Sequence, residues 1–122
     1  MSEVTVLIVE DDNIIAQIAD WRLKNLGYTV CGRAATGAEA MELLVKHKPD
    51  IVLMDINIKG DIDGIETAKM IKKEFSIPVV YVTSHSDGLT LERAKETKPE
   101  GFILKPFEDD DLRVAIEMAL KK

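Results

Sequence analysis

Apolar residues follow two alternating patterns along this chain. Short runs rich in β-branched residues are typical of strands, and they are separated by segments in which apolar residues recur at helical spacing. The runs that we expect to form strands are residues 4–9, 29–33, 51–54, 79–83 and 101–104. Five such alternations predict an α/β fold, in which a parallel sheet carries helices on both faces.

Helix boundaries are marked by turn and capping residues. The first helix precedes Gly27, a natural C-terminal stop, and its expected buried face consists of Ile15, Ile18, Ala19, Leu23 and Leu26. The second opens with the sequence TGAE at residues 36–39, which predicts a capping box in which hydroxyl and carboxylate satisfy backbone N–H groups. The third opens with Asp63 as its cap, and Asp61 is expected to be a loop residue.

The last two helices complete the alternation. The fourth falls within residues 86–97 and is ended by Pro99. The fifth begins at the acidic residues 108–111 and ends at Lys121 and Lys122, an arrangement of charges that suits the helix dipole.

Composition narrows the class of protein. The 122 residues are 46% hydrophobic and suffice for one domain, which we expect to span residues 1–122 without an output domain. Sixteen basic and 22 acidic residues give a net charge of −6, which argues against direct binding of nucleic acid. We find no signal peptide and no apolar run long enough to span a membrane. Cys31 is the only cysteine, so we expect an inert core thiol and a cytoplasmic location.

Polar residues follow four of the expected strands. In open parallel sheets the carboxyl ends of the strands meet at one edge, where ligands bind. The residues concerned are Glu10, Asp11 and Asp12 after the first strand, Asp55 after the third, Thr83 and Ser84 at the end of the fourth, and Lys105 after the fifth. Adjacent carboxylates repel one another and resist burial, and a divalent cation with a preference for oxygen ligands removes that conflict. The sequence therefore predicts a Mg²⁺ site, although Asp12 is better explained as the cap of the first helix.

This set of groups suits phosphoryl transfer. A cation and an ammonium neutralise phosphoryl oxygens, a hydroxyl donates a hydrogen bond, and a carboxylate can accept the phosphoryl group. Asp55 is the best-placed acceptor because it stands alone at the end of a central strand. Each residue by itself is also common in a purely structural role, so the hypothesis depends on the convergence of all four strand ends.

The chain resembles the receiver domain of two-component response regulators over essentially its whole length. The matching segments are LIVEDD, IVLMDINI, DGIE, PVVYVTS and GFILKPF, which are highly specific when they occur in this order and spacing. The resemblance implies a doubly wound, flavodoxin-like fold of five parallel strands in the order 2-1-3-4-5 with five helices.

The resemblance also implies a role for each site residue. Asp55 would be the phosphoacceptor, and Mg²⁺ would be held by Glu10, Asp11, Asp55 and the main-chain carbonyl of Asn57. Thr83 would supply the switch hydroxyl and Lys105 would pair with the phosphoryl group. The bond from Lys105 to Pro106 is expected to be cis, and Phe102 occupies the position of the aromatic switch residue.

The implied activity is signalling rather than enzymatic. A sensor histidine kinase or phosphotransfer protein would donate a phosphoryl group from phosphohistidine to Asp55, and the domain would then dephosphorylate itself slowly. Thr83 and Phe102 would move and alter the surface of the fourth helix, fifth strand and fifth helix, which a downstream output protein or output domain would read. The molecule would be a monomer or a weak dimer.

Three departures from the usual family pattern stand out. The loop at residues 56–64 is one residue longer and lacks the common proline. Phe102 replaces the frequent tyrosine, so the switch side chain has no hydroxyl. Asn57 and His85 occupy variable positions that tune phosphoryl lifetime in the family.

Three alternatives compete with this interpretation. Residues 55–66 nearly match a calcium-binding EF-hand loop, but Lys59 occupies a ligand position and a strand-like segment precedes the loop. A phosphatase of the haloacid dehalogenase type would need a second aspartate where Asn57 stands. A receiver-like interaction module that works without phosphorylation would keep the fold and lose the chemistry.

Overall fold

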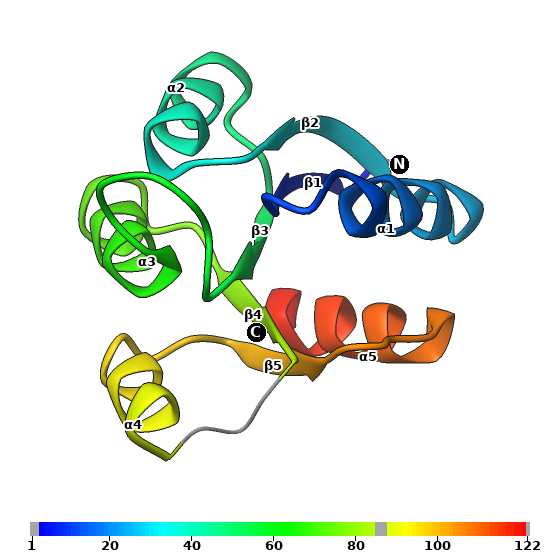
Figure 1. Ribbon diagram of the computed structural model, residues 1–122. Helices are drawn as coiled ribbons and strands as arrows, with labels where there is room; N and C mark the ends of the chain where they lie inside the picture. Colours follow the sequence, from blue (N-terminus) through cyan, green and yellow to red (C-terminus); the bar gives the residue numbers. More distant parts are fainter. Residues whose placement is uncertain (1–2, 85–87, 122) are drawn as a thin grey trace.

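The alternating pattern produces a parallel sheet between two layers of helices (Figure 1). The computed structural model describes residues 3–84 and 88–121. The elements are β1 (Thr5–Val9), α1 (Asn13–Asn25), β2 (Thr29–Ala34), α2 (Gly37–His47), β3 (Ile51–Asp55), α3 (Gly64–Glu74), β4 (Val79–Thr83), α4 (Gly88–Glu96), β5 (Gly101–Leu104) and α5 (Asp109–Leu120). In this part of the chain no helix is long and apolar enough to cross a bilayer.

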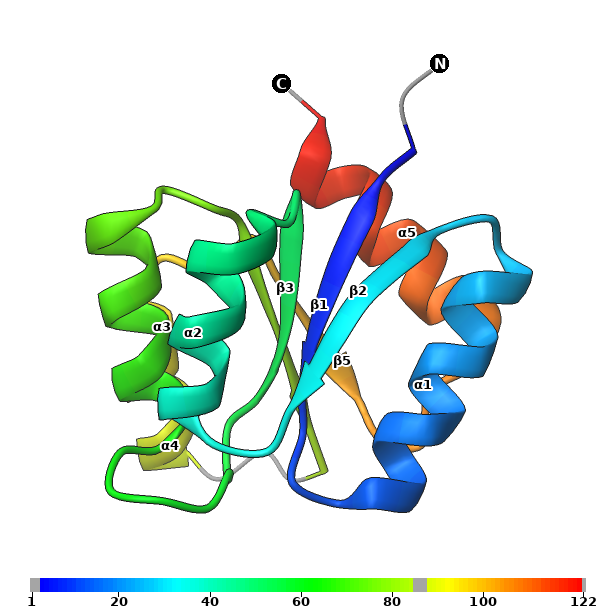
Figure 2. The same cartoon turned by 90° about the horizontal axis from the view of Figure 1, so that it is seen from above.

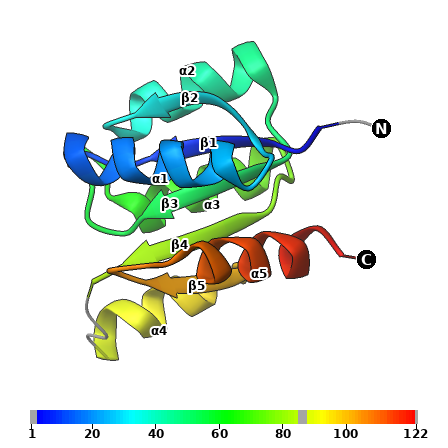
Figure 3. The ribbon, with the colours of Figure 1, turned by 90° about the vertical axis from the view of Figure 1, so that its right-hand side faces the viewer.

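The sheet has the strand order β2-β1-β3-β4-β5, and all neighbouring strands are parallel, as predicted. Helices α2, α3 and α4 cover one face, and α1 and α5 cover the other (Figure 2). In register, Asp55 lies opposite Val82, and Thr83 lies opposite Leu104. The carboxyl ends of the central strands therefore meet at one edge of the sheet, where the arrowheads gather in Figure 3.

Each face of the sheet has its own hydrophobic core, because successive strand residues point to opposite faces. Leu7, Met54 and Tyr81 pack under α2, α3 and α4, and their neighbours Ile8, Leu53 and Val80 pack under α1 and α5. The central strands β3 and β4 are buried along their whole length. The polar residues at their carboxyl ends are therefore held by rigid, fully packed backbone.

Cys31 lies on β2 at the edge of the core under α2, partly buried and with a free thiol. Burial raises the pKa of this thiol. Since the reactive species is the thiolate, the expectation of an unreactive cysteine agrees with its surroundings.

The helix caps agree with the sequence in two cases and differ in one. The Asp12 and Asp63 side chains accept backbone N–H groups at the starts of α1 and α3, at 2.9 to 3.1 Å. At α2 the Thr36 hydroxyl accepts the N–H of Glu39 at 3.2 Å, as predicted. The Glu39 carboxylate, however, accepts from Ala35 at 2.8 Å and not from Thr36, so it bonds the residue before the cap.

The prediction that Ile18 belongs to the buried face of α1 is wrong. That face consists of Ala16, Ala19 and Leu23, with Ile15 and Leu26 partly buried beside them, while Ile18 is 44% exposed. The small side chains of Ala16 and Ala19 let α1 approach the sheet, and this approach turns Ile18 to the side of the helix. Sequence periodicity alone could not distinguish the two arrangements.

The longer loop after Asp55 packs against its neighbour rather than projecting into solvent. Ile56 and Ile58 are buried in the core under α2 and α3. A parallel bridge joins Lys59 to Thr36 in the β2–α2 connection, and Gly60 beside it has φ of +108°, a conformation that favours glycine. The loop is thus anchored at its middle, close to the edge of the sheet that carries the polar residues.

Candidate phosphoacceptor and metal site

Four strand ends bring the predicted site residues to one edge of the sheet. Glu10 follows β1, Asp55 and Thr83 end β3 and β4, and Lys105 follows β5. The Lys105 N–H donates to the Thr83 carbonyl at 2.8 Å, which fixes the two strand ends side by side. Glu10, Asp55 and Thr83 are all buried, so their polar groups face an enclosed site rather than bulk water.

Lys105 provides the positive charge of this site. Its ammonium lies 2.7 Å from the Glu10 carboxylate and 3.5 Å from the Asp55 carboxylate. Burial by itself would lower the pKa of Lys105, but the hydrogen bond to Glu10 and the charge of Asp55 raise it overall. Lys105 therefore remains a cation. The Lys105–Pro106 bond that follows is cis, as predicted.

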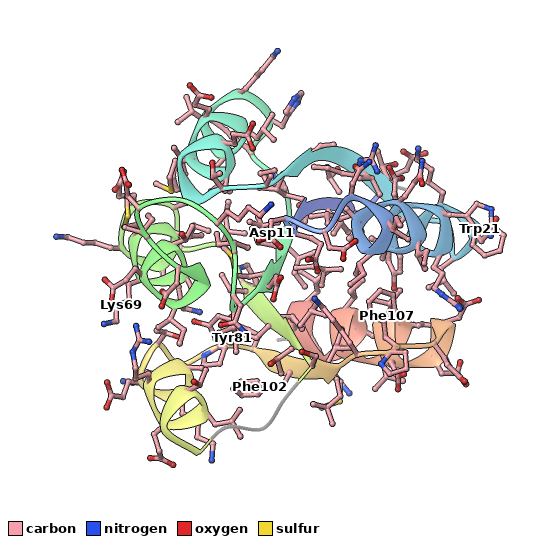
Figure 4. The ribbon with its side chains drawn as sticks, in the orientation of Figure 1. Asp11, Trp21, Lys69, Tyr81, Phe102 and Phe107 are labelled. Atoms are coloured by element: carbon pink, nitrogen blue, oxygen red, sulfur yellow. The ribbon has the colours of Figure 1, made fainter. Side chains whose placement is uncertain are left out.

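The carboxylates of Glu10, Asp11 and Asp55 form a group whose oxygens lie within 4.8 Å of one another. Asp11 is labelled at the end of β1 in Figure 4. Asp12 does not join this group, because its side chain caps α1. Three close carboxylate oxygens match the ligands that Mg²⁺ takes in proteins, so the donor set fits that ion. The Asn57 carbonyl stays a predicted ligand; the Asn57 N–H donates to Asp55 Oδ1 at 3.2 Å.

The Glu10 carboxyl group has a raised pKa. Burial, together with the neighbouring Asp55, raises the pKa of Glu10 to about 7, although the bond from Lys105 opposes the shift. Near neutral pH this carboxyl is thus close to its point of half protonation. A cation placed between the three acids would favour the ionised form and release the proton.

Gly64 allows the start of α3 to approach the Asp55 backbone. A Cβ on Gly64 would overlap the Asp55 carbonyl oxygen and press against the Cα of Ile56. The Gly64 N–H also donates to the Ile56 carbonyl at 2.9 Å. Sequence reasoning missed this positioning role, because the adjacent Asp63 was sufficient to explain the helix start.

The predicted switch residue Phe102 lies on β5 next to Tyr81 of β4. Their ring centroids are 5.6 Å apart with the planes tilted by 33°, and Figure 4 shows the two labelled side chains close together. Phe102 is 38% exposed, whereas Tyr81 is fully buried. The aromatic switch position is therefore half outside the core in this conformation.

An apolar hollow opens beside Lys105. It has a volume of about 400 Å³ and lies between α1 and the β5–α5 connection. Its walls are formed by Ile15, Ile18, Arg22, Ser84, Lys105, Pro106 and Phe107. The exposed position of Ile18, which the sequence did not predict, gives this hollow one of its walls.

The EF-hand alternative is wrong. Ile51–Asp55, which precedes the loop, is a buried strand and not the helix that an EF-hand requires. Glu66, which would be the final calcium ligand, pairs with Lys69 at 3.4 Å and Arg93 at 3.7 Å. His47 is exposed on α2 outside the acidic group, and His85 lies outside the described residues.

Comparison with known proteins agrees with this geometry. The family model of the response regulator receiver domain matches residues 6–117. The chain belongs to the response regulator receiver family. This receiver domain is 38% identical over 117 residues to the transcriptional regulatory protein PdtaR of Mycobacterium tuberculosis, covering 96% of the chain and 57% of that protein. It spans about half the length of the curated relatives it matches.

Solved structures share the fold of this receiver domain closely. The signal receiver domain of a modulated diguanylate cyclase from Desulfovibrio desulfuricans is 39% identical, with a TM-score of 0.93 over 98% of this chain and 94% of that one. The N-terminal domain of a response regulator/sensory box/GGDEF protein from Carboxydothermus hydrogenoformans is 34% identical, with a TM-score of 0.85 over 95% and 93%. The flavodoxin-like receiver fold is thereby confirmed.

Proposed function

We propose that this receiver domain accepts a phosphoryl group on Asp55 in a reaction that requires Mg²⁺. The observation that carries the proposal is the convergence of three carboxylates and one ammonium at the carboxyl ends of β1, β3 and β5. Glu10, Asp11, Asp55 and the Asn57 main-chain carbonyl would hold the ion. Mg²⁺ would supply charge to offset the phosphoryl oxygens as they approach the acidic site.

The donor is a phosphohistidine of a sensor kinase or phosphotransfer protein. An Asp55 carboxylate oxygen attacks phosphorus, the P–N bond breaks, and the histidine nitrogen keeps the electron pair. Lys105 pairs with a phosphoryl oxygen in place of a carboxylate, and the Thr83 hydroxyl donates to another. Water later attacks phosphorus and releases inorganic phosphate, so the domain is a signalling phosphoacceptor rather than an enzyme with a separate substrate.

The apolar hollow beside Lys105 offers the donor protein a place to bind next to the site. A donor helix seated between α1 and the β5–α5 connection would bury Ile15, Ile18 and Pro106, and it would carry its histidine to the rim of the acidic site. Action in the cytoplasm is part of the proposal, because a free thiol such as that of Cys31 persists in reducing compartments.

The output of the domain is a change of the surface formed by α4, β5 and α5. Capture of the Thr83 hydroxyl by the phosphoryl group makes room for Phe102 to rotate inward. The exposed apolar residues Leu104, Val114 and Met118 lie on the same surface, where an output protein or domain would bind. A local change of charge at Asp55 is thereby converted into a change of a binding surface.

The experiment that tests the proposal is intact-mass spectrometry after incubation with acetyl phosphate, with and without Mg²⁺. We expect a gain of one phosphoryl group that requires Mg²⁺ and is absent in Asp55→Asn. Asp61→Asn, which changes an exposed loop aspartate, is the matched control and should behave as the wild type. No gain under any condition would favour the phosphorylation-independent interaction module. A gain that survives Asp55→Asn would place the acceptor elsewhere.

A further inference from the structure

A pair of buried hydroxyl groups joins the central strand β4 to the end of α4. The Tyr81 hydroxyl lies 2.7 Å from Thr97 Oγ1, and both residues are buried. The Thr97 hydroxyl donates its single proton to the Ala94 carbonyl at 2.6 Å, so the Tyr81 hydroxyl must be the donor to Thr97. Burial raises the pKa of Tyr81, which keeps this donor protonated. The bond therefore has a defined direction, from strand to helix.

This bond is a buried polar attachment of the end of α4 to the sheet. Arg93 also links α4 to Asp63 at 3.2 Å and to Glu66 at 3.7 Å, but these ion pairs are exposed and contribute little. A buried hydroxyl that loses its partner, in contrast, pays the full cost of desolvation. The bond between Tyr81 and Thr97 thus helps to fix the last turn of α4 to β4, beside the core packing of Ala94.

Tyr81 also lies between the two residues of the proposed switch. It precedes Thr83 by two positions on β4, so their side chains leave the same face of the strand. Its ring contacts Phe102 of β5 at 5.6 Å, as Figure 4 shows. Because Tyr81 is fully buried, its ring already occupies space next to Phe102 on the inner side. We expect the inward rotation of Phe102 to press on the Tyr81 ring even after the Thr83 hydroxyl has moved, and the bond to Thr97 to resist a shift of that ring.

We propose that Tyr81 and Thr97 are positioning residues of the switch, whose hydrogen bond holds α4 and the Tyr81 ring in place and stabilises the unphosphorylated conformation. The inference rests on the proposed function, because it concerns the response to a phosphoryl group on Asp55. Removal of the bond lowers the free energy needed to reach the phosphorylated conformation. By linkage, a phosphoryl analogue then binds more tightly at Asp55, although neither residue touches that site.

The test is titration with beryllofluoride, a phosphoryl analogue for aspartate, at saturating Mg²⁺, followed by amide NMR spectra. Tyr81→Phe removes the hydroxyl and keeps the ring, and Thr97→Val removes the acceptor with little change of volume. We expect both variants to bind beryllofluoride about fivefold more tightly than the wild type, the equivalent of one net hydrogen bond. Thr97→Ser, which retains the hydroxyl, should restore the wild-type midpoint. Tyr28→Phe removes the hydroxyl of a partly buried tyrosine just before β2 and should change nothing.

Amide hydrogen exchange without ligand provides a second measurement. The N–H groups of Thr97 and Lys98, which bond to the last turn of α4, should exchange faster in Tyr81→Phe and Thr97→Val. Faster exchange with an unchanged or weaker beryllofluoride midpoint would overturn the proposal, because the bond would then be structural alone. Unchanged exchange with an unchanged midpoint would overturn it as well. If the wild type itself did not respond to beryllofluoride, the proposed function would fail, and the switch role would fail with it.

Discussion

Lys105 is paired more closely with Glu10 than with Asp55: its ammonium lies 2.7 Å from the Glu10 carboxylate and 3.5 Å from that of Asp55. Both pairs are largely shielded from water. The Lys105 ammonium thus neutralises part of the negative charge of the acidic site. Binding of Mg²⁺ and arrival of a phosphoryl group would each change the partner of Lys105.

Replacement of Lys105 tests this competition between cations. In Lys105→Ala the three carboxylates lose their neutralising charge, so we expect Mg²⁺ to bind roughly tenfold more tightly. Phosphorylation by acetyl phosphate should nevertheless become slower, since the phosphoryl oxygens lose the same partner. Isothermal titration with Mg²⁺ and the time course of intact mass measure the two effects. Lys46→Ala, at an exposed position of α2, is the control, and equal Mg²⁺ affinity in both variants would contradict the competition.

The raised pKa of Glu10 predicts a pH dependence of Mg²⁺ binding. The ion binds the ionised carboxyl, and with a pKa of about 7 the proton competes with Mg²⁺ below that value. Apparent Mg²⁺ affinity should therefore rise about tenfold between pH 6 and pH 8, with release of a proton. Titration of Mg²⁺ at several pH values measures this slope.

When Mg²⁺ is absent, a rise in pH acts through Glu10 in the opposite direction, because it lowers the stability of the fold. A pKa raised from the ordinary 4.5 to about 7 means that the folded protein holds the proton more tightly than the unfolded chain. The contribution of Glu10 to stability is thus complete below pH 4.5 and is lost as pH rises through 7. Glu10→Gln should remove both pH effects; a slope that survives in this variant would assign the titration to another group.

Asp11 and Asp12 are adjacent but are expected to separate in function. Asp12→Ala removes the cap of α1 and should cost about 1 kcal/mol of stability, with phosphorylation preserved. Asp11→Ala should leave stability nearly unchanged and weaken Mg²⁺ binding by roughly tenfold or more, because a charged ligand is lost. Urea unfolding and Mg²⁺ titration of both variants test the distinction. Equal losses of Mg²⁺ affinity would show that Asp12 also contributes to the metal site.

Gly64 should be intolerant of a side chain. In Gly64→Ala the new methyl group overlaps the Asp55 carbonyl, and overpacking of this kind costs about 1–3 kcal/mol. We expect a lower urea midpoint and slower phosphorylation, since the acceptor backbone must move. Gly101→Ala is the matched control: its methyl group would meet Val80 at an ordinary contact distance of 3.8 Å, so stability should be kept or slightly raised. Similar behaviour of the two variants would contradict the positioning role of Gly64.

The sequence was sufficient for features that depend on local pattern. The β-branched runs predicted all five strands to within one residue at either end, and those at 79–83 and 101–104 match β4 and β5 in full. Parallel strands place their carboxyl ends at one edge, so the convergence of Glu10, Asp55, Thr83 and Lys105 followed from their positions along the chain. Capping by Asp12 and Asp63 also followed, because a cap bonds only to residues two or three positions away.

Tertiary structure decided the features that depend on how closely separate elements approach. Three such features depend on residues from different strands or helices. They are the close pairing of Lys105 with Glu10, the lack of space at Gly64 beside Asp55, and the bond from Tyr81 to Thr97. The exposure of Ile18 likewise depends on the approach of α1 to the sheet. A linear pattern specifies the face of a strand or helix from which a side chain points. The separation between elements, to within a few tenths of an ångström, is set by the packing of the whole core. The sequence by itself therefore determined the fold and the chemical groups of this receiver domain, and its tertiary packing determined how those groups are paired.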